Sequence, residues 1–236
     1  MKRTFSLSTG TCLALLGACL ITNPAGAQSV TFDFQDGTDQ GFGTGFGNDA
    51  SKAFPIVNIG GSFRMEVTLG GFQVAGREGG GGAFLAAMNA AAANPLLSTI
   101  SYDWYINTAL SVSSSNGPSY GTFLQLGTYI NSGSGAYSQD FPGSGRDVEL
   151  TAAQLASGSV FSGTVTETLT AKYGAINPGH LDQTFQRFGL IMNGTAGATP
   201  VVYFDNITIT AIPEPSSLAL LGLAVPAFWM MRRRKS

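Results

Sequence analysis

The chain has 236 residues, of which 44% are hydrophobic and only 11% are charged, with 32 glycines and a formal net charge of −2. This near balance hides an acidic middle, because residues 28–211 hold six basic and thirteen acidic side chains, a difference of −7. An acidic domain repels phosphate backbones, so the composition argues against a nucleic-acid partner.

The first 27 residues have the layout of a signal peptide. A basic start precedes a short apolar run at residues 11–21, and Ala25 and Ala27 are the small residues that a signal peptidase requires. We expect cleavage after Ala27. Two alternatives stay open, namely an uncleaved anchor and lipidation of Cys19 within a Leu-Gly-Ala-Cys stretch.

Residues 28–211 are long enough for one domain with a sizeable core, and no linker divides them. Both cysteines, Cys12 and Cys19, lie in the predicted signal peptide, so the exported part has neither a disulfide nor a cysteine metal site. We therefore expect the domain to fold on its hydrophobic core alone.

Short segments of alternating apolar and polar residues recur through this domain, separated by Gly, Asn, Ser and Pro. Many such segments predict an all-β fold, an antiparallel two-sheet β-sandwich. Residues 83–95 are compatible with a short helix or with a strand and a loop, and residues 150–158 with one helical turn. The strand-like segments are residues 30–37, 62–71, 100–107, 122–131, 160–170, 184–194 and 200–210.

Three aromatic residues of the segment 100–107 are candidates for stacking on sugar rings. Alternation places Tyr102 and Trp104 together, and their spacing favours the core. Tyr105 lies on the opposite face, so it is the candidate for a glycan contact.

No catalytic group stands out, and we predict that the protein is not an enzyme. Ser119 occurs in a Gly-x-Ser-x-Gly pattern, but the pattern lies between strand-like segments and lacks the strand-to-helix elbow that a hydrolase needs. His180 is the only histidine, and we expect it to be an exposed loop residue. Glu66, Glu149 and Glu167 are isolated on separate segments, so they do not form the carboxylate pair of a glycosidase.

The two ends of the domain resemble jelly-roll carbohydrate-binding domains. Residues 32–43, FDFQDGTDQGFG, are similar to the opening of such domains, and residues 185–210 to their last two strands. The resemblance implies a structural calcium near the first and last strands, for which Asp33, Asp36 and Asp205 are candidates. Gln35 replaces the carboxylate of the family's motif, and we predict no cofactor or metal while leaving calcium open.

Residues 212–236 form a separate C-terminal segment. An apolar stretch follows a Pro-Glu-Pro motif, and its helix, at about residues 216–231, is short for a membrane span. A basic cluster after it favours a cytoplasmic end. The motif is Pro213, Glu214 and Pro215, and the cluster is Arg232, Arg233, Arg234 and Lys235.

This tail resembles the PEP-CTERM sorting signal. The resemblance implies export, anchoring in the inner membrane, handling by an exosortase and delivery to the cell surface or extracellular matrix, with links to extracellular polysaccharide and biofilm. We therefore expect a noncatalytic protein that is glycan-associated or structural, with signal peptidase, exosortase, membrane and polysaccharide as partners. A polysaccharide-acting hydrolase or lyase of jelly-roll fold is the alternative.

Overall fold

The structure is a computed structural model of the whole chain, and it describes residues 27–44, 53–68, 71–111, 120–139 and 146–212. Ala25, Cys19, Ser119 and the whole sorting segment from Pro213 onward lie outside these residues. Within them, no helix combines the length and the apolar character needed to cross a membrane. The helix predicted at 216–231 belongs to the part that is not described.

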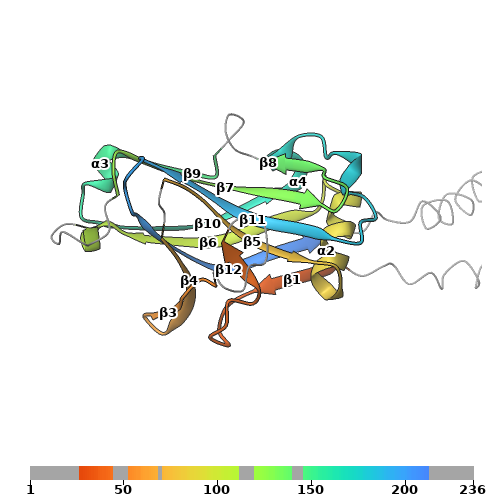
Figure 1. Cartoon of the computed structure of the whole chain (residues 1–236), viewed down its shortest axis with the longest axis horizontal. Coiled ribbons are helices and arrows are strands. Elements are labelled where there is room, and N and C mark those ends of the chain that lie inside the picture. The colour runs from red at the N-terminus through yellow and green to blue at the C-terminus, as the bar shows by residue number, and fades with distance from the viewer. Residues whose placement is uncertain (1–26, 45–52, 69–70, 112–119, 140–145, 213–236) are drawn as a thin grey trace, which may run out of the picture. The chain divides into compact units, whose positions relative to one another are not determined.

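Residues 28–212 form one compact unit built from two antiparallel six-stranded sheets (Figure 1). The predicted β-sandwich is therefore confirmed. Sheet A has the order β10 (Val160–Thr168), β6 (Thr99–Asn107), β12 (Val201–Ala211), β4 (Ser62–Thr68) and β3 (Ile56–Ile59), with β1 (Gln28–Phe32) also paired to β12. Sheet B has the order β2 (Phe42–Thr44), β5 (Phe72–Gly79), β11 (Gln186–Gly194), β7 (Phe123–Ser132) and β8 (Tyr137–Gln139), with β9 (Val148–Thr151) also paired to β7.

The hydrophobic core lies between the sheets and follows the alternation of the strands. On β6, Tyr102 and Ile106 are completely buried, while their neighbours Asp103 and Tyr105 are only partly buried. Trp104 is half-buried and packs against the core. The prediction that Tyr102 and Trp104 belong to the core side of this strand is thus confirmed.

Strand β12 changes neighbours halfway along its length. Residues 201–204 pair with β4, whereas residues 207–211 pair with β1, and β6 lies along the other side. The register with β6 shifts between Asp205 and Thr208, and Asn206 adopts a left-handed backbone with φ of 48°. This β-bulge keeps Phe204 and Ile207 in the core and turns Asp205 and Asn206 to the outer face.

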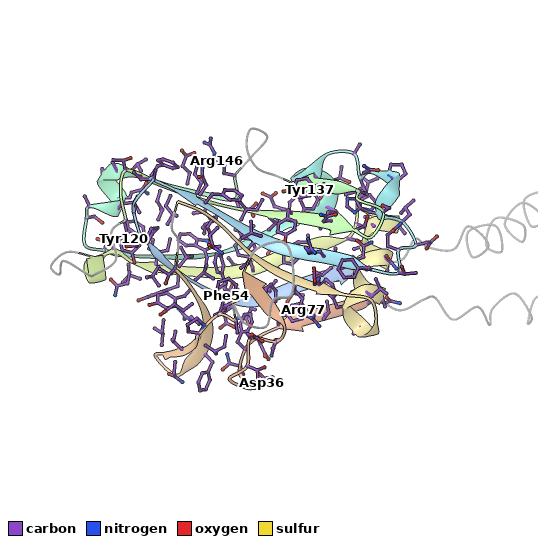
Figure 2. All side chains as sticks on the ribbon, viewed as in Figure 1. Asp36, Phe54, Arg77, Tyr120, Tyr137 and Arg146 are labelled. Carbon is purple, nitrogen blue, oxygen red and sulfur yellow. The ribbon has the colours of Figure 1, made fainter. Side chains whose placement is uncertain are left out.

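The helix-friendly stretch is a helix, α2 (Gly82–Ala93), which buries its Phe84 ring in the core. Arg77 of β5, labelled in Figure 2, has its guanidinium carbon 5.4 Å from the centre of the Phe84 ring. Just after the helix, the Asn94 side chain donates a hydrogen bond to the carbonyl of Ile212 (2.6 Å), and Ser98 Oγ accepts one from the Ile212 amide (3.3 Å). The segment after α2 thereby holds the last residue before the Pro-Glu-Pro motif.

The other helical segments among the described residues are short. They are α3 (Ala152–Leu155), α4 (Leu169–Tyr173), and two 3-10 turns, η2 (Thr108–Ser111) and η3 (Pro178–His180). The predicted helical turn at 150–158 corresponds to α3, whose N-terminus is closed by a capping box between Thr151 and Gln154.

The expectation of an exposed His180 is wrong, because its side chain is completely buried. Asn177 caps the η3 turn by accepting a hydrogen bond from the Gly179 amide, and the Gly179 carbonyl accepts one from Ser132 of β7 (2.9 Å). These bonds draw the Pro-Gly loop onto sheet B, where Ser138 Oγ lies 3.2 Å from His180 Nε2. Burial lowers the pKa of His180, which favours the neutral ring.

A second, smaller cluster on the other face of sheet B consists of Val74, Tyr129 and Ile191. Tyr129 pairs across the sheet with Gly189, and its ring occupies the space above that glycine. A Cβ atom on residue 189 would lie 2.1 Å from Tyr129 Cε1. The glycine is therefore required by packing.

We expect Gly189→Ala to destabilise the fold by about 1–3 kcal/mol, because the added methyl group must displace the Tyr129 ring. Gly79→Ala is the matched control on β5, where a Cβ would lie 3.6 Å from Phe84, an ordinary contact. Urea unfolding of both variants would test this. Equal stability of the two would show that Tyr129 moves without cost.

Candidate functional site

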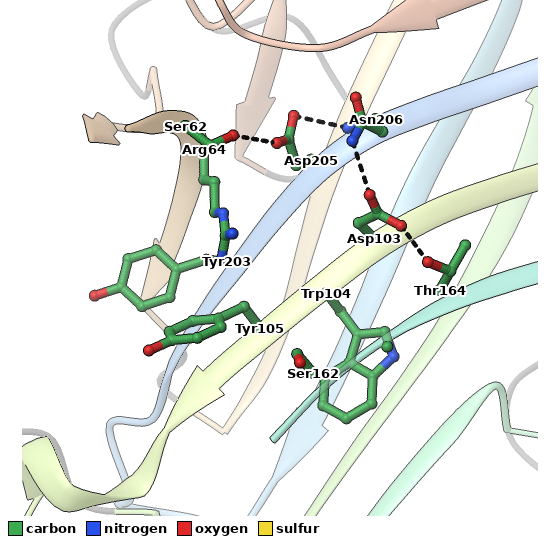
Figure 3. A pocket seen from close by; sticks show the side chains of 11 residues that line it. Ser62, Arg64, Asp103, Trp104, Tyr105, Ser162, Thr164, Tyr203, Asp205 and Asn206 are labelled. Carbon is green, nitrogen blue, oxygen red and sulfur yellow. Dashed lines mark hydrogen bonds between the residues drawn. The ribbon is translucent and has the colours of Figure 1, made fainter. Parts of the chain in front are cut away.

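An open pocket of about 440 Å³ lies on the outer face of sheet A, across strands β4, β12, β6 and β10 (Figure 3). We call it the sheet A pocket. The lining residues that matter for its chemistry are Arg64, Asp103, Tyr105, Tyr203, Asp205 and Asn206.

The strand register arranges these side chains in rows. Tyr105 of β6 is the direct cross-strand partner of Tyr203 on β12, and Asp103 is the partner of Asp205. Two carboxylates directly opposite each other destabilise a sheet, so the surrounding structure must hold them. A costly arrangement of this kind in a pocket marks a candidate functional site.

Hydrogen bonds fix both carboxylates, one donor to each oxygen (Figure 3). Asp205 accepts from Ser62 Oγ (2.9 Å) and from the Asn206 backbone amide (2.8 Å). Asp103 accepts from Asn206 Nδ2 (2.7 Å) and from Thr164 Oγ1 (2.5 Å). Asn206 therefore bridges the two acids, and the bulge is what brings its amide there. Each carboxylate oxygen keeps a second lone pair for a ligand hydroxyl.

The other half of the pocket is aromatic. The rings of Tyr105 and Tyr203 lie 5.8 Å apart, and the Arg64 guanidinium is 4.9 Å from the centre of the Tyr105 ring. Among the described residues, no carboxylate forms an ion pair with Arg64. Trp104 reaches the pocket beside Gly163, where a Cβ would lie only 3.1 Å from the indole nitrogen.

Burial raises the pKa values of two residues that line the pocket. Burial raises the pKa of the Asp205 carboxyl above its ordinary value, and the nearby Asp103 charge adds to that rise, while the hydrogen bonds from Asn206 and Ser62 oppose it. Burial also raises the pKa of Tyr203 to about 12, with a further contribution from Glu66. Tyr203 therefore keeps its proton at neutral pH.

Of the residues predicted from the sequence, Tyr105 lines this pocket, and a role in glycan contact stays a prediction. The three calcium candidates do not converge. Asp33 accepts a hydrogen bond from the Gln35 amide, Asp36 from Thr38, and Asp205 lies in the pocket. In the described part of the chain, no three His, Cys, Asp or Glu side chains gather as a metal site.

Side-chain hydrogen bonds of Gln35 hold the loop of the resembled motif against β4. The Gln35 side chain donates a hydrogen bond to the Phe63 carbonyl (3.1 Å) and accepts one from the Phe63 amide (3.4 Å). The residue that replaces the family's carboxylate thus ties the first loop to β4. Ala27 directly precedes β1, while the predicted sorting residues are outside the described part.

Sequence reasoning missed Arg64, Asp103 and Asn206 as members of one site. Each occupies an outward position that a solvated strand face also permits, so alternation alone does not single them out. A usable signal is the adjacent polar pair Asp205-Asn206 between the apolar residues Phe204 and Ile207, because it breaks the two-residue period and indicates a bulge.

The C-terminal end matches a known family, described as the PEP-CTERM protein-sorting motif, over residues 211–235. The chain carries a PEP-CTERM sorting motif. No protein of curated description matches the chain in sequence.

Among solved structures, the chain is similar to carbohydrate-binding β-sandwiches. A module described as specific for non-crystalline cellulose, CBM28, is 12% identical, with a TM-score of 0.50 over 74% of this chain and 89% of that chain. CBM27-1 of Caldicellulosiruptor saccharolyticus, solved with mannohexaose, is 12% identical, with a TM-score of 0.43 over 78% and 96% of the two chains. The family 30 module of Clostridium thermocellum cellulase Cel9D-Cel44B is 12% identical, with a TM-score of 0.45 over 80% and 99%.

We expect the wild type to lose stability as pH rises through the titration of Asp205, and we expect Asp205→Asn to show no such loss. The amide removes the charge facing Asp103, although it keeps only one oxygen for the two donors, Ser62 and the Asn206 amide. The sign follows from the raised pKa: the folded state favours protonated Asp205, so stability falls as pH rises through its titration, and the neutral amide avoids this loss. Thermal unfolding at acid and neutral pH would measure the effect. A variant whose stability falls with rising pH as steeply as that of the wild type would contradict it.

Proposed function

We propose that this is an exported, noncatalytic glycan-binding protein of the cell surface or extracellular matrix, and that the sheet A pocket is its binding site. The observation that carries the proposal is the placement of an aromatic pair beside fixed carboxylate and amide groups in one open pocket. The sandwich fold, which is similar to that of carbohydrate-binding modules, supports the class of protein but not the ligand.

The two halves of the pocket suit the two kinds of surface on a sugar. The partly exposed Tyr105 ring can pack against the apolar C–H face of a pyranose, and Arg64 covers part of that ring. Asp103, Asp205 and Asn206 offer acceptors and an amide for the ring hydroxyls. Because their hydrogen bonds already fix them, little side-chain entropy is lost on binding.

Charge in the pocket favours an uncharged glycan. Arg64 contributes +1 and the two aspartates −2, so these three residues sum to −1. Glu66, next to Tyr203 on the neighbouring strand, adds another negative charge close by. An acidic sugar would meet net repulsion, whereas neutral hydroxyls can donate hydrogen bonds to the carboxylates.

We expect Tyr105→Ala to weaken binding to neutral polysaccharides about tenfold, because it removes the stacking surface. Binding of the full chain in detergent to a panel of neutral and acidic polysaccharides would measure this. Tyr105→Phe should retain binding.

Tyr137→Ala is the matched control, since Tyr137 is a partly exposed tyrosine on β8 of sheet B (Figure 2). Loss of binding in this variant, with normal binding of Tyr105→Ala, would move the site to sheet B. A folded chain that binds no polysaccharide would favour a purely structural surface protein.

A polysaccharide-acting hydrolase or lyase is the second candidate. It is favoured by one observation, the pair of pocket carboxylates of which Asp205 has a raised pKa, as a general acid requires. Incubation with each bound polysaccharide should release no new reducing ends or unsaturated products if the site only binds. Release that disappears in Asp205→Asn would establish the enzyme instead.

The sorting motif supports export, membrane anchoring before sorting and processing by an exosortase. In this proposal residues 1–27 are the signal peptide, residues 28–211 the binding domain and residues 212–236 the sorting segment. The helix at about 216–231 holds the chain in the inner membrane, with the basic cluster on the cytoplasmic side.

Glu214→Ala should leave the uncut chain in the membrane, because it alters the centre of the Pro-Glu-Pro motif. Immunoblots of membrane and medium fractions from a host with the exosortase would measure this, with Ser216→Ala as the control. Normal release of the Glu214→Ala chain would contradict the role of the motif.

A further inference from the structure

A lysine and an aspartate meet in the interior and connect the two sheets. Lys172 Nζ lies 2.5 Å from Asp147 Oδ1, and the two side chains are 0% and 2% exposed. Lys172 belongs to α4, which directly follows β10 of sheet A. Asp147 directly precedes β9 of sheet B, and its amide extends that ladder by donating to the Leu126 carbonyl (3.0 Å).

Tyr102 of β6 completes the group. Its hydroxyl donates a hydrogen bond to Asp147 Oδ2 (2.7 Å), and its ring centre lies 5.9 Å from Lys172 Nζ. Tyr102 is completely buried. Both oxygens of the Asp147 carboxyl group are thus engaged, one by the amine and one by a phenol that polarises the C–O bond.

The geometry brings the amine close to the carboxyl carbon. The Nζ to Oδ1 distance is shorter than the roughly 2.7–2.9 Å usual for charge-assisted N–H···O bonds. Because a C=O bond is about 1.2 Å long, Nζ lies within about 3.7 Å of Asp147 Cγ. This approaches the separation of about 3–3.5 Å at which bound groups react.

We propose that Lys172 and Asp147 are joined by an isopeptide bond. A proton first passes from the Lys172 ammonium to the Asp147 carboxylate, which leaves a neutral amine and a carboxylic acid. The Nζ lone pair then attacks Cγ and forms the C–N bond, while the C–O bond to the acid's hydroxyl breaks. That hydroxyl takes the second proton from nitrogen and leaves as water, and one N–H remains in the amide.

The interior favours this product. One cation and one anion become one neutral amide, which removes the cost of keeping two charges away from water. Fixed groups in contact react with effective concentrations of about 10⁵–10⁸ M, which offsets the unfavourable loss of water from a free acid and amine. Burial also keeps hydrolytic water away from the bond.

The bond would brace the sandwich without redox chemistry. Residues 28–212 contain no cysteine, so a disulfide cannot link the sheets. An amide between residues 147 and 172 closes a covalent loop that includes β9, α3, β10 and most of α4. The inference is independent of glycan binding, because none of its three residues lines the sheet A pocket.

Tryptic digestion of the purified full chain after denaturation tests the proposal. Trypsin cuts after Arg146, and it cuts after Lys172 only if that side chain is a free amine. The expected product is therefore peptide 147–187, lighter than its sequence mass by one water, with fragment ions that place the link between residues 147 and 172. Linear peptide 147–172 at full mass would overturn the proposal.

Two variants test which side chains form and promote the bond. Lys172→Arg keeps the cation but has no amine, so it should release peptide 147–172 without loss of water. Tyr102→Phe keeps the ring but loses the hydroxyl, so it should lower the fraction of linked peptide. Loss of water at Asp147 with normal cleavage after residue 172 would indicate a succinimide and would also overturn the proposal.

Discussion

The structure depends on how β12 meets its neighbours. This strand pairs with β6 along one side and with β4 and then β1 along the other, while one of its faces fills the core. In a regular strand, the side chains would keep alternating between the two faces at the point where the neighbouring strand changes. The bulge at Asp205 and Asn206 shifts the period instead, so that Phe204 and Ile207 both point inward. The same shift places an amide between two opposed carboxylates, so fold and pocket share one local irregularity.

The charged groups of the domain occur in two different environments. In the sheet A pocket, the partly exposed Asp103 and the largely buried Asp205 keep acceptor lone pairs on the pocket side, although their repulsion weakens the sheet. In the interior, Asp147 is closed off by Tyr102 and Lys172, and no exposed surface remains for a ligand. The first arrangement suits recognition from outside, and the second suits a fixed connection between the sheets.

Alternation predicted the sandwich because one face of each long strand must be apolar to form the core. It also placed Tyr105 on the outer face and Tyr102 inside. It missed short strands such as β3 and β8, since three or four residues carry too little periodicity. The loop position of His180 gave the wrong prediction of exposure, because the hydrogen bonds that bury its loop come from serines far away in sequence. The pocket escaped prediction for the same reason: its members come from four strands, and only the register brings them together.

The hydrogen bonds of Asn94 and Ser98 to Ile212 have a mechanical consequence. A pull on the chain beyond Ile212 enters the domain at the end of β12, where β1 and β6 flank it on both sides in antiparallel register. If the pull acts along the axis of β12, the ladder bonds lie across the force, so they share the load in shear and do not open one by one. A chain anchored beyond Ile212 would therefore load the β12 ladder before any other part of the domain.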